Sequence, residues 1–373
     1  MKLTRVEIEN FRCFERLTLS LEPDVTAVIG VNAAGKTALL DAVALALRPM
    51  IADSLSGKPA SADPKSLPWE DVSGLALRPT DLGIGTEETQ GSSGRLRRSA
   101  IAMTIAASDP RDASKSLSLE CRQEMEFTAQ LNIESRRTLW SEPVGIARAL
   151  DGLWLPAGGD AHGAHIDIPT LAFYRDSRNC RGRSHPQMNP EAMDRDSGFV
   201  RAFDAGSDFE AAQLWFYMRE NQELRAAREH GDTAFEFPDL ATIRKALSLM
   251  LDGIERVYTD DNPPRLKVDK KDAGGQTLTL ELAQLSAGQR NLLALTLDFA
   301  RRLALTHPGW DQPLEAPGIL LIDEIELNLH PKWQQSVISH LRRVFPHTQI
   351  IVATHSPQVL STLEARQITA NPF

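Results

Sequence analysis

The chain has 373 residues and 42% hydrophobic content, enough to bury the core of one large domain or two moderate ones. Its formal net charge of −9 excludes a globally basic nucleic-acid binder and leaves that role to a local patch or a partner. Three cysteines without a pairing pattern argue against a disulfide scaffold, and no apolar run reaches the roughly 20 residues of a membrane span, so we expect a soluble cytoplasmic protein.

The N-terminal segment alternates apolar and polar residues in two short runs, 2–9 and 17–22. This period of two predicts a β-hairpin, which leads into the apolar strand "VTAVIG" ending at Gly30.

A phosphate-binding loop follows that strand. Gly30 to Thr37 fit the pattern G-x-x-x-x-G-K-[ST] at every fixed position, between an apolar strand and a helix. The backbone N–H groups of Asn32, Ala33, Ala34 and Gly35 would face the phosphates of a nucleoside triphosphate, with the helix N-terminus behind them. Lys36 would reach the β- and γ-phosphates and Thr37 would hold Mg²⁺. The alternative, a glycine turn before an amphipathic helix, does not account for the order of strand, loop and helix.

The middle of the chain changes character several times. Residues 50–100 are polar and rich in Ser, Gly and Pro, and 99–108 and 116–132 predict strands of an antiparallel sheet. A strand is expected within 167–178, helices over 207–230 and 239–252, and alternating strands and helices from 276 onward. We therefore predict an α/β protein with three parts: an N-terminal lobe (1–166), a helical insert (167–275) and a C-terminal lobe (276–373).

Two further motifs carry polar groups that suit nucleotide chemistry. "LSAGQR" places Ser286, Gly288 and Gln289 at the start of a helix, where they could contact a γ-phosphate, although such a sequence is also a common N-cap. "GILLIDE" reads as a buried strand that ends in Asp323 and Glu324. Asp323 would complete the Mg²⁺ shell, and Glu324 would activate the attacking water.

The last of these motifs, "QIIVATHS", ends an apolar strand at His355. This side chain could contact the γ-phosphate, but a single histidine at a strand end is more often structural. Its assignment depends on the presence of the other motifs in the same order.

Taken together, these motifs resemble the RecF/SMC-like branch of the ABC-type ATPases, often called AAA family ATPases. "VEIENFRCF", "DFEAAQLWFYMRENQELRA" and the segment from Leu321 to Ser361 carry the resemblance, which covers 55–165 only loosely. It implies an ABC-type head whose phosphate-loop core has a parallel sheet, and a dimer in which Ser286 and Gly288 act on the ATP held by the partner's Lys36. It also implies that Arg12 faces the phosphates, although a solvent-exposed turn is an equal alternative. Tyr174, Arg175 and Arg178 are candidates for the glutamine-loop position, which the sequence does not identify.

The spacing of the motifs bears on the kind of head. Only 286 − 36 = 250 positions separate Lys36 from Ser286, without sustained heptads, which disfavours a long coiled-coil arm. Only 373 − 355 = 18 residues follow His355, too few for an appended nuclease domain, and the chain is either a naturally short head or a truncated one.

The resemblance is strongest to the PtuA-type defence ATPases of Septu and retron systems, which implies a separate HNH-type nuclease partner and a role in anti-phage defence. The alternatives are a RecF-like DNA-binding clamp for repair, or an ATP-gated scaffold with negligible turnover. DNA or RNA is a further candidate partner, because 94–99, 175–183 and 300–305 are rich in Lys or Arg. The default interpretation of each stretch is an ordinary solvated charge run.

Overall fold

The computed structural model describes residues 1–31, 34–56, 87–91, 94–109, 112–127, 133–140, 169–176, 196–203, 209–232, 234–251, 253–261, 264–272 and 274–370. The chain forms two compact units that alternate along the sequence. The first comprises 1–169, 349–355 and 364–373, and the second 170–348 and 356–363. The division of the sequence at 166 and 275 stays a prediction.

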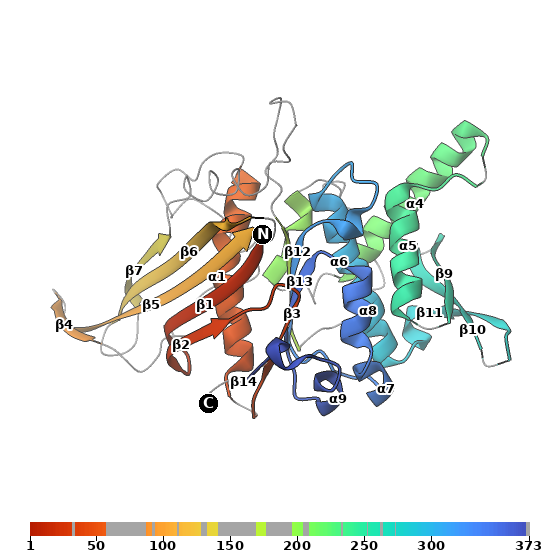
Figure 1. Cartoon of the computed structure of the whole chain (residues 1–373). Coiled ribbons are helices and arrows are strands. Elements are labelled where there is room, and N and C mark those ends of the chain that lie inside the picture. The colour runs from red at the N-terminus through yellow and green to blue at the C-terminus, as the bar shows by residue number, and fades with distance from the viewer. Residues whose placement is uncertain are drawn as a thin grey trace. The chain divides into compact units, whose positions relative to one another are not determined.

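An antiparallel sheet forms one part of the first unit (Figure 1). Its strand order is β2-β1-β5-β6-β7, and β4 pairs with β5. The strands are β1 (Lys2–Phe11), β2 (Phe14–Ser20), β4 (Glu87–Gly91), β5 (Gly94–Asp109), β6 (Asp112–Phe127) and β7 (Ile133–Trp140). Successive side chains of a strand point to opposite faces, and a β-bulge between Leu3 and Arg5 shifts this alternation by one residue. Leu3, Val6 and Ile8 are therefore all buried on one side of β1. The predicted hairpin and the antiparallel strands that follow it are confirmed.

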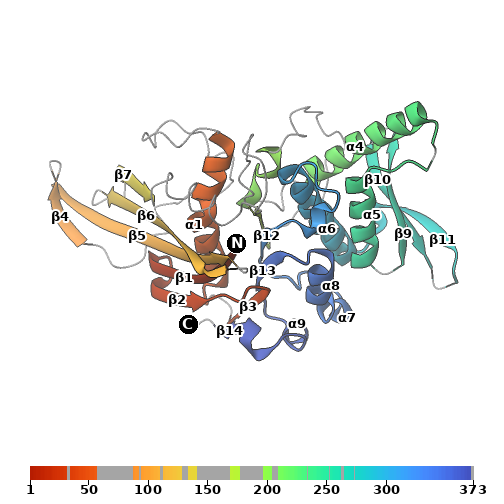
Figure 2. The same cartoon turned by 45° about the horizontal axis from the view of Figure 1, so that its top comes forward.

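The other part of the first unit is parallel. Strand β3 (Val25–Ile29) lies between β14 (Ile368–Ala370) and β13 (Thr348–Ala353), and pairs with both in parallel. Helix α1 (Lys36–Ser56) packs against the antiparallel sheet (Figure 2). The fully buried side-chain amide of Gln349 joins the two parts: its oxygen accepts from Leu3 N at 2.7 Å, and its nitrogen donates to Leu3 O at 2.8 Å and Glu22 O at 2.7 Å.

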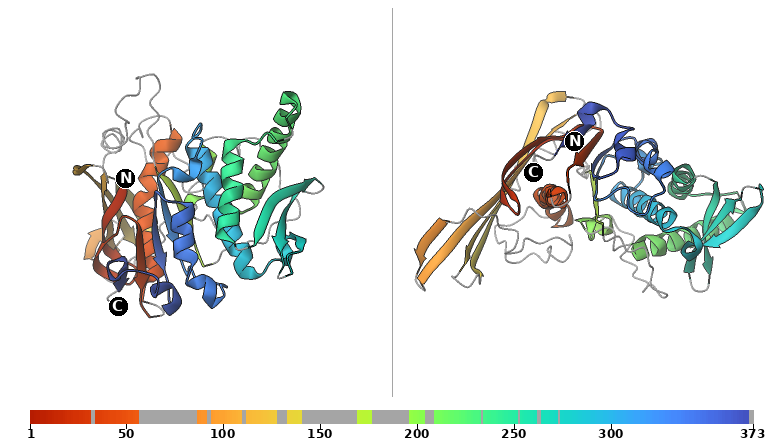
Figure 3. Two further views of the ribbon diagram at one scale, coloured as in Figure 1. Left: turned by 45° about the vertical axis from the view of Figure 1, so that its right-hand side comes forward. Right: turned by 90° about the horizontal axis from the view of Figure 1, so that it is seen from below.

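Two buried parallel strands form the centre of the second unit. Strand β8 (Thr170–Tyr174) pairs with β12 (Gly318–Ile322) along its whole length. Every residue of both strands is buried, which accounts for their continuous apolar sequences. Helix α6 (Ala287–Thr306) packs on β8 and also on the two helices α4 (Phe209–His230) and α5 (Pro238–Met250) (Figure 3). It is therefore buried around most of its circumference.

The outer part of this unit consists of α4 (Phe209–His230), α5 (Pro238–Met250) and a three-stranded antiparallel sheet. The sheet has the order β11-β10-β9, with β9 (Ile254–Asp261), β10 (Pro264–Lys271) and β11 (Thr277–Glu281). Sequence reading missed β9 and β10, although "DNPP" between two alternating runs is a turn signal that could have shown them.

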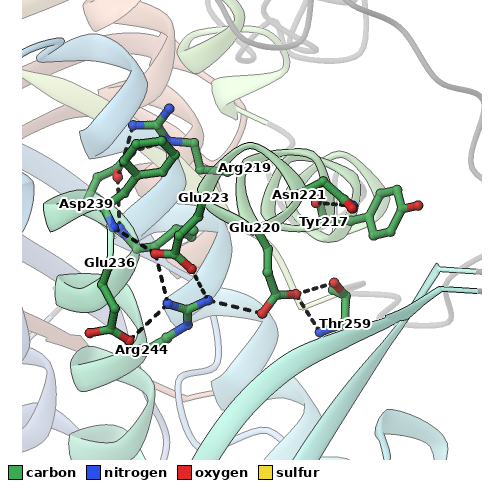
Figure 4. A network of polar contacts seen from close by, with 11 residues as sticks. Tyr217, Arg219, Glu220, Asn221, Glu223, Glu236, Asp239, Arg244 and Thr259 are labelled. Atoms are coloured by element: carbon green, nitrogen blue, oxygen red, sulfur yellow. Dashed lines mark hydrogen bonds and ion pairs between the residues drawn. The ribbon is translucent and has the colours of Figure 1, made fainter. Parts of the chain in front are cut away.

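An arginine-centred network joins α4 to α5 (Figure 4). Arg244 donates to Glu223 at 2.8 Å, to Glu220 at 3.1 Å and to Glu236 at 3.3 Å. Glu220 in turn accepts from the backbone of Thr259 on β9 at 2.8 Å. These groups line a cavity of about 700 Å³ between the two helices and β9. The network therefore holds the outer sheet to the helices.

Three further α-helices follow β12. They are the helices α7 (Pro331–Gln334), α8 (Val337–Val344) and α9 (Pro357–Leu360). Among the residues described, none of the helices combines the length and apolar character needed to cross a membrane. The architecture confirms the predicted fold class: an α/β protein with parallel strands and an N-terminal antiparallel lobe.

Candidate functional site

The described part of the loop between β3 and α1 includes one glycine in a backbone conformation that other residues rarely adopt. Gly35 has φ +81°, in the left-handed region that favours glycine. A Cβ on Gly35 would lie 2.4 Å from the sulfur of Cys13 and 2.9 Å from Phe14 Cζ, so a larger residue would push the loop away from the β1–β2 turn. The loop then enters α1 directly at Lys36. Two of its predicted residues, Asn32 and Ala33, lie outside the described residues.

Lys36 is almost completely buried, and its ammonium group lies over the loop. Its Nζ donates to Val31 O at 2.9 Å and to Gly30 O at 3.1 Å. These carbonyls belong to the same loop, so the ammonium group lies against the loop that the sequence predicts to bind phosphates. Thr37, the next residue, is exposed and Ala34 is buried. The residues present therefore fit a Mg²⁺–nucleotide complex, with the Thr37 hydroxyl as the metal ligand from this loop.

Arg12 lies next to the same loop but is paired within the unit. Its guanidinium forms an ion pair with Asp41, a buried residue on the second turn of α1. Arg12 has φ 52°, an uncommon value for a residue with a side chain, and it stacks 4.9 Å from the ring of Phe11. The predicted contact of Arg12 with phosphates stays a prediction. Sequence reading missed Asp41, although its position four residues after Thr37 places both on one face of the helix.

His355 follows β13, next to the phosphate loop's own strand. Ala353 pairs with Val28, and Thr354 N donates to Val28 O at 3.2 Å. Because β3 and β13 are parallel, their carboxyl ends lie at the same edge of the sheet. His355 and the loop that starts at Gly30 both begin at this edge, and the histidine is exposed. The first unit thus brings together Arg12, residues 34–37 and His355.

The second unit holds the acidic pair. Asp323, only 2% exposed, follows β12, and its N–H donates to Tyr174 O at 2.8 Å. Glu324 is partly exposed and has φ 46°, in the left-handed region. Non-glycine residues held there cost of order 1–3 kcal/mol and are concentrated at functional sites. This geometry makes Glu324 the strongest catalytic candidate of this unit.

The predicted signature residues form the N-terminus of α6. Ser286 is the N-cap: its Oγ accepts from Gln289 N at 3.3 Å, while Gln289 Oε1 accepts from Ser286 N at 3.2 Å. This geometry is compatible with both interpretations of the motif, a contact with a γ-phosphate and a helix N-cap. Gly288 is buried against the loop that follows β12, where a Cβ would lie 2.5 Å from Asn328 O. The second unit thus brings Gly288 together with the loop that carries Glu324.

One basic stretch differs from its prediction. Residues 300–305 were candidates for a DNA-facing patch or a solvated charge run, but Arg301 and Arg302 are 1% and 0% exposed. Both readings of this stretch are wrong, because the surrounding helices cover α6. The side chains of 94–99 and residues 177–183 lie outside what the structure describes.

Two family models match the chain. One described as "AAA ATPase domain" matches residues 1–74, which include the phosphate loop. Another, described as "AAA domain, putative AbiEii toxin, Type IV TA system", matches residues 195–361. This second range contains Ser286, the acidic pair and His355.

Curated relatives match parts of the sequence. The Retron Ec83 probable ATPase of Escherichia coli is 43% identical over 129 residues, which are 35% of this chain and 23% of that protein. The Septu protein PtuA of Bacillus mycoides is 37% identical over 83 residues, 22% of this chain and 11% of that protein. The matched stretches thus span less than a quarter of the length of these relatives.

The fold also has a solved counterpart. The structure of an SMC head bound to the C-winged helix domain of ScpA aligns with a TM-score of 0.51 and 13% sequence identity. The alignment covers 99% of this chain and 94% of that one. At this level of identity the likeness shows the fold, which is that of an SMC-type head.

Proposed function

We propose that this chain, an SMC/RecF-like AAA ATPase head by its family matches and its fold, binds ATP with Mg²⁺ and hydrolyses it between two copies of the head. The observation that supports this most strongly is the phosphate loop. Its left-handed Gly35 and the buried Lys36 ammonium over its carbonyls stand between an apolar strand and a helix.

Each residue has a distinct part in this proposal. Lys36 and the N–H groups of residues 32–35 hold the β- and γ-phosphates, and Thr37 and Asp323 hold Mg²⁺. The bound ion would neutralise charge on the transferred phosphoryl group. Glu324 accepts a proton from the attacking water, and His355 contacts the γ-phosphate. Ser286, Gly288 and Gln289 complete the site of the partner head from their helix N-terminus.

The acidic pair gives the first test. We expect Glu324→Gln to lower ATP turnover by about 100-fold or more while ATP binding is retained, because removing a general base costs about that much. Glu315→Gln is the matched control: this exposed carboxylate lies before β12, at the opposite end of the strand, and should leave turnover unchanged. Equal turnover of Glu324→Gln and wild type would overturn the assignment.

The shared site is tested with mixed dimers. One head carries Ser286→Arg and the other is wild type, and turnover at the wild-type phosphate loop is isolated by adding Lys36→Ala to the Ser286→Arg head. We expect that turnover to be lost, because the arginine lies where the partner's γ-phosphate would be. Unchanged turnover in this mixed dimer would contradict action across two heads.

The resemblance to Septu and retron ATPases supports a finer proposal. Closure of two heads on ATP controls a separate HNH-type nuclease chain in anti-phage defence. ATP turnover and oligomer size of wild type and Glu324→Gln, measured with and without duplex DNA, separate this role from the repair clamp. DNA-stimulated turnover with a DNA-bound mutant dimer favours the clamp. Slow turnover indifferent to DNA, with a stable assembly, favours the gated nuclease.

A further inference from the structure

Four side chains form a buried polar cluster between α6 and β8: Tyr174, Asp298, Arg301 and Arg302. The Tyr174 hydroxyl donates to Asp298 Oδ2 at 2.7 Å, and Arg302 Nε donates to the same oxygen at 2.8 Å. Arg301 donates to Asp298 Oδ1 at 2.8 Å. None of the four is more than 2% exposed. The carboxylate of Asp298 therefore ties the middle of α6 to the last residue of β8.

Burying charged side chains costs free energy, so the presence of this cluster calls for an explanation. Replacing a buried ion cluster by apolar side chains of similar volume is often neutral or stabilising, so such clusters are weak evidence for stability alone. Arg302 adds two further bonds, to Gly198 O and Val200 O, both at 2.9 Å, which orient its guanidinium. The cluster thus fixes the orientation of the Arg302 side chain as well as its contact with Asp298.

The cluster connects to the acidic pair through the backbone. Tyr174 pairs with Ile322 in the parallel ladder, and Tyr174 O accepts the N–H of Asp323 at 2.8 Å. The side chain of Tyr174 is held by α6, and its carbonyl holds Asp323. Any shift of the hydroxyl end is therefore transmitted to the residue that precedes Glu324.

A second contact joins the start of α6 to the same loop. Gly288 lies so close to Asn328 that a Cβ would be 2.5 Å from its carbonyl oxygen. Asn328 has φ 61° and Glu324 has φ 46°, and Leu327 N donates to Glu324 O at 2.9 Å in the turn between them. The loop 324–328 thus holds two uncommon backbone conformations between its contacts with α6 and β8.

We propose that Tyr174 and Asp298 are positioning residues. When the N-terminus of α6 binds the nucleotide held by a partner head, these two residues transmit the position of α6 to Asp323 and Glu324 of the head to which α6 belongs. This inference rests on the proposed function of Ser286 and Glu324. It adds a route inside one head that couples the two ATP sites of a dimer. The four side chains are buried between α6 and β8 and are not among the residues proposed to bind the nucleotide. We therefore expect their loss to affect the chemical step and not binding to the phosphate loop.

The test compares Tyr174→Phe with Thr170→Val. Tyr174→Phe removes only the hydroxyl that donates to Asp298. Thr170→Val is the matched control, because Thr170 is the first residue of the same strand and its hydroxyl pairs with Thr306 of the same helix at 2.5 Å. We expect Tyr174→Phe to lower kcat at least five-fold with KM for ATP within two-fold. Thr170→Val should leave both within two-fold.

Amide hydrogen exchange gives a readout independent of turnover. In the full-length Tyr174→Phe protein, residues 323–330 should exchange at least five-fold faster than in wild type, and in Thr170→Val they should not. Equal effects of the two variants, on kcat or on exchange, would overturn the proposal, as would a change in KM alone. A wild-type protein without ATP turnover would instead contradict the proposed function.

Discussion

The two arginine networks of the second unit are built in opposite ways. Around Asp298, one carboxylate lies between two arginines, and none of these residues is more than 1% exposed. Around Arg244, one guanidinium lies among three carboxylates (Figure 4). These groups line a cavity of about 700 Å³. The Glu236 side chain there is 57% exposed.

This difference in burial decides what each network can do. The network around Arg244 borders a cavity and includes the exposed Glu236, so water screens its charges more than those around Asp298. The charges around Asp298 have no such screening, and removal of one leaves the others unbalanced in the core. The network around Arg244 attaches the outer sheet to the helices. The cluster around Asp298 fixes strand β8, which pairs with the strand that ends at the acidic pair.

The largest expected effect comes from Asp298→Ala. This change removes the buried carboxylate that Arg301 and Arg302 share, and breaking a buried pair in this way costs about 3–5 kcal/mol. Urea unfolding followed by circular dichroism measures the loss. A loss similar to that of an exposed ion pair would mean that the cluster is hydrated and that the contrast with Arg244 is wrong.

Arg244→Ala should have a smaller effect. It leaves Glu220 and Glu223, 7% and 5% exposed, without their guanidinium, but both border the open cavity and water can reach them. We expect a loss of about 1–3 kcal/mol, the range for an unsatisfied buried group. ATP turnover at a temperature well below unfolding should be unchanged, because the hydrogen bonds of the network, among the described residues, join α4, α5 and β9. Loss of turnover in a folded variant would show that the two networks are coupled.

The pH dependence of stability sharpens the comparison further. Burial alone would raise the pKa of Asp298, but the charges of Arg302 and Arg301 outweigh it and hold the pKa below its usual 3.8. The unfolded chain therefore takes up this proton at a higher pH than the folded one. The stability from Asp298 is present above pH 3.8 and is lost as the pH falls through the folded pKa. The difference in unfolding free energy between wild type and Asp298→Asn should shrink in that window. A difference independent of pH would mean that the carboxylate is not ionised in the fold.

The smallest effect is expected from Glu236→Gln. Its bond to Arg244 is 3.3 Å long and its side chain is mostly exposed. Exposed substitutions of this kind usually change stability by no more than about 0.5 kcal/mol. Urea unfolding of Glu236→Gln and of Arg244→Ala compares the loss of unfolding free energy at the exposed edge of the network with the loss at its centre. An equal loss in the two variants would show that Glu236 is not a peripheral member.

Local sequence patterns were sufficient for the strands and turns that carry the candidate site. The apolar runs before Gly30 and Asp323 predicted β3 and β12, because buried parallel strands need continuous apolar sequence. Ser286 predicted a helix start because its hydroxyl can cap the helix. The ends of these elements can be predicted because they depend on residues that lie close together in the sequence.

The partners of the charged side chains could not be predicted in the same way. Arg301 and Arg302 read as a solvated pair, since nothing within α6 shows that helices and β8 cover it on several sides. Their carboxylate lies on the same helix, but the Tyr174 hydroxyl comes from 124 positions earlier in the chain. Contacts over such distances depend on tertiary packing and leave no local period in the sequence.

The amide of Gln349 has a consequence for how the protein is made. It bonds to Leu3, 346 positions earlier, and the strands β13 and β14 on either side of β3 are likewise synthesised long after it. During translation, β3 therefore emerges without both of its parallel neighbours and cannot complete its ladder. The phosphate loop gains its supporting sheet only after residue 370 has left the ribosome. A nascent chain thus completes the sheet behind the proposed phosphate loop only after most of the second unit has been synthesised.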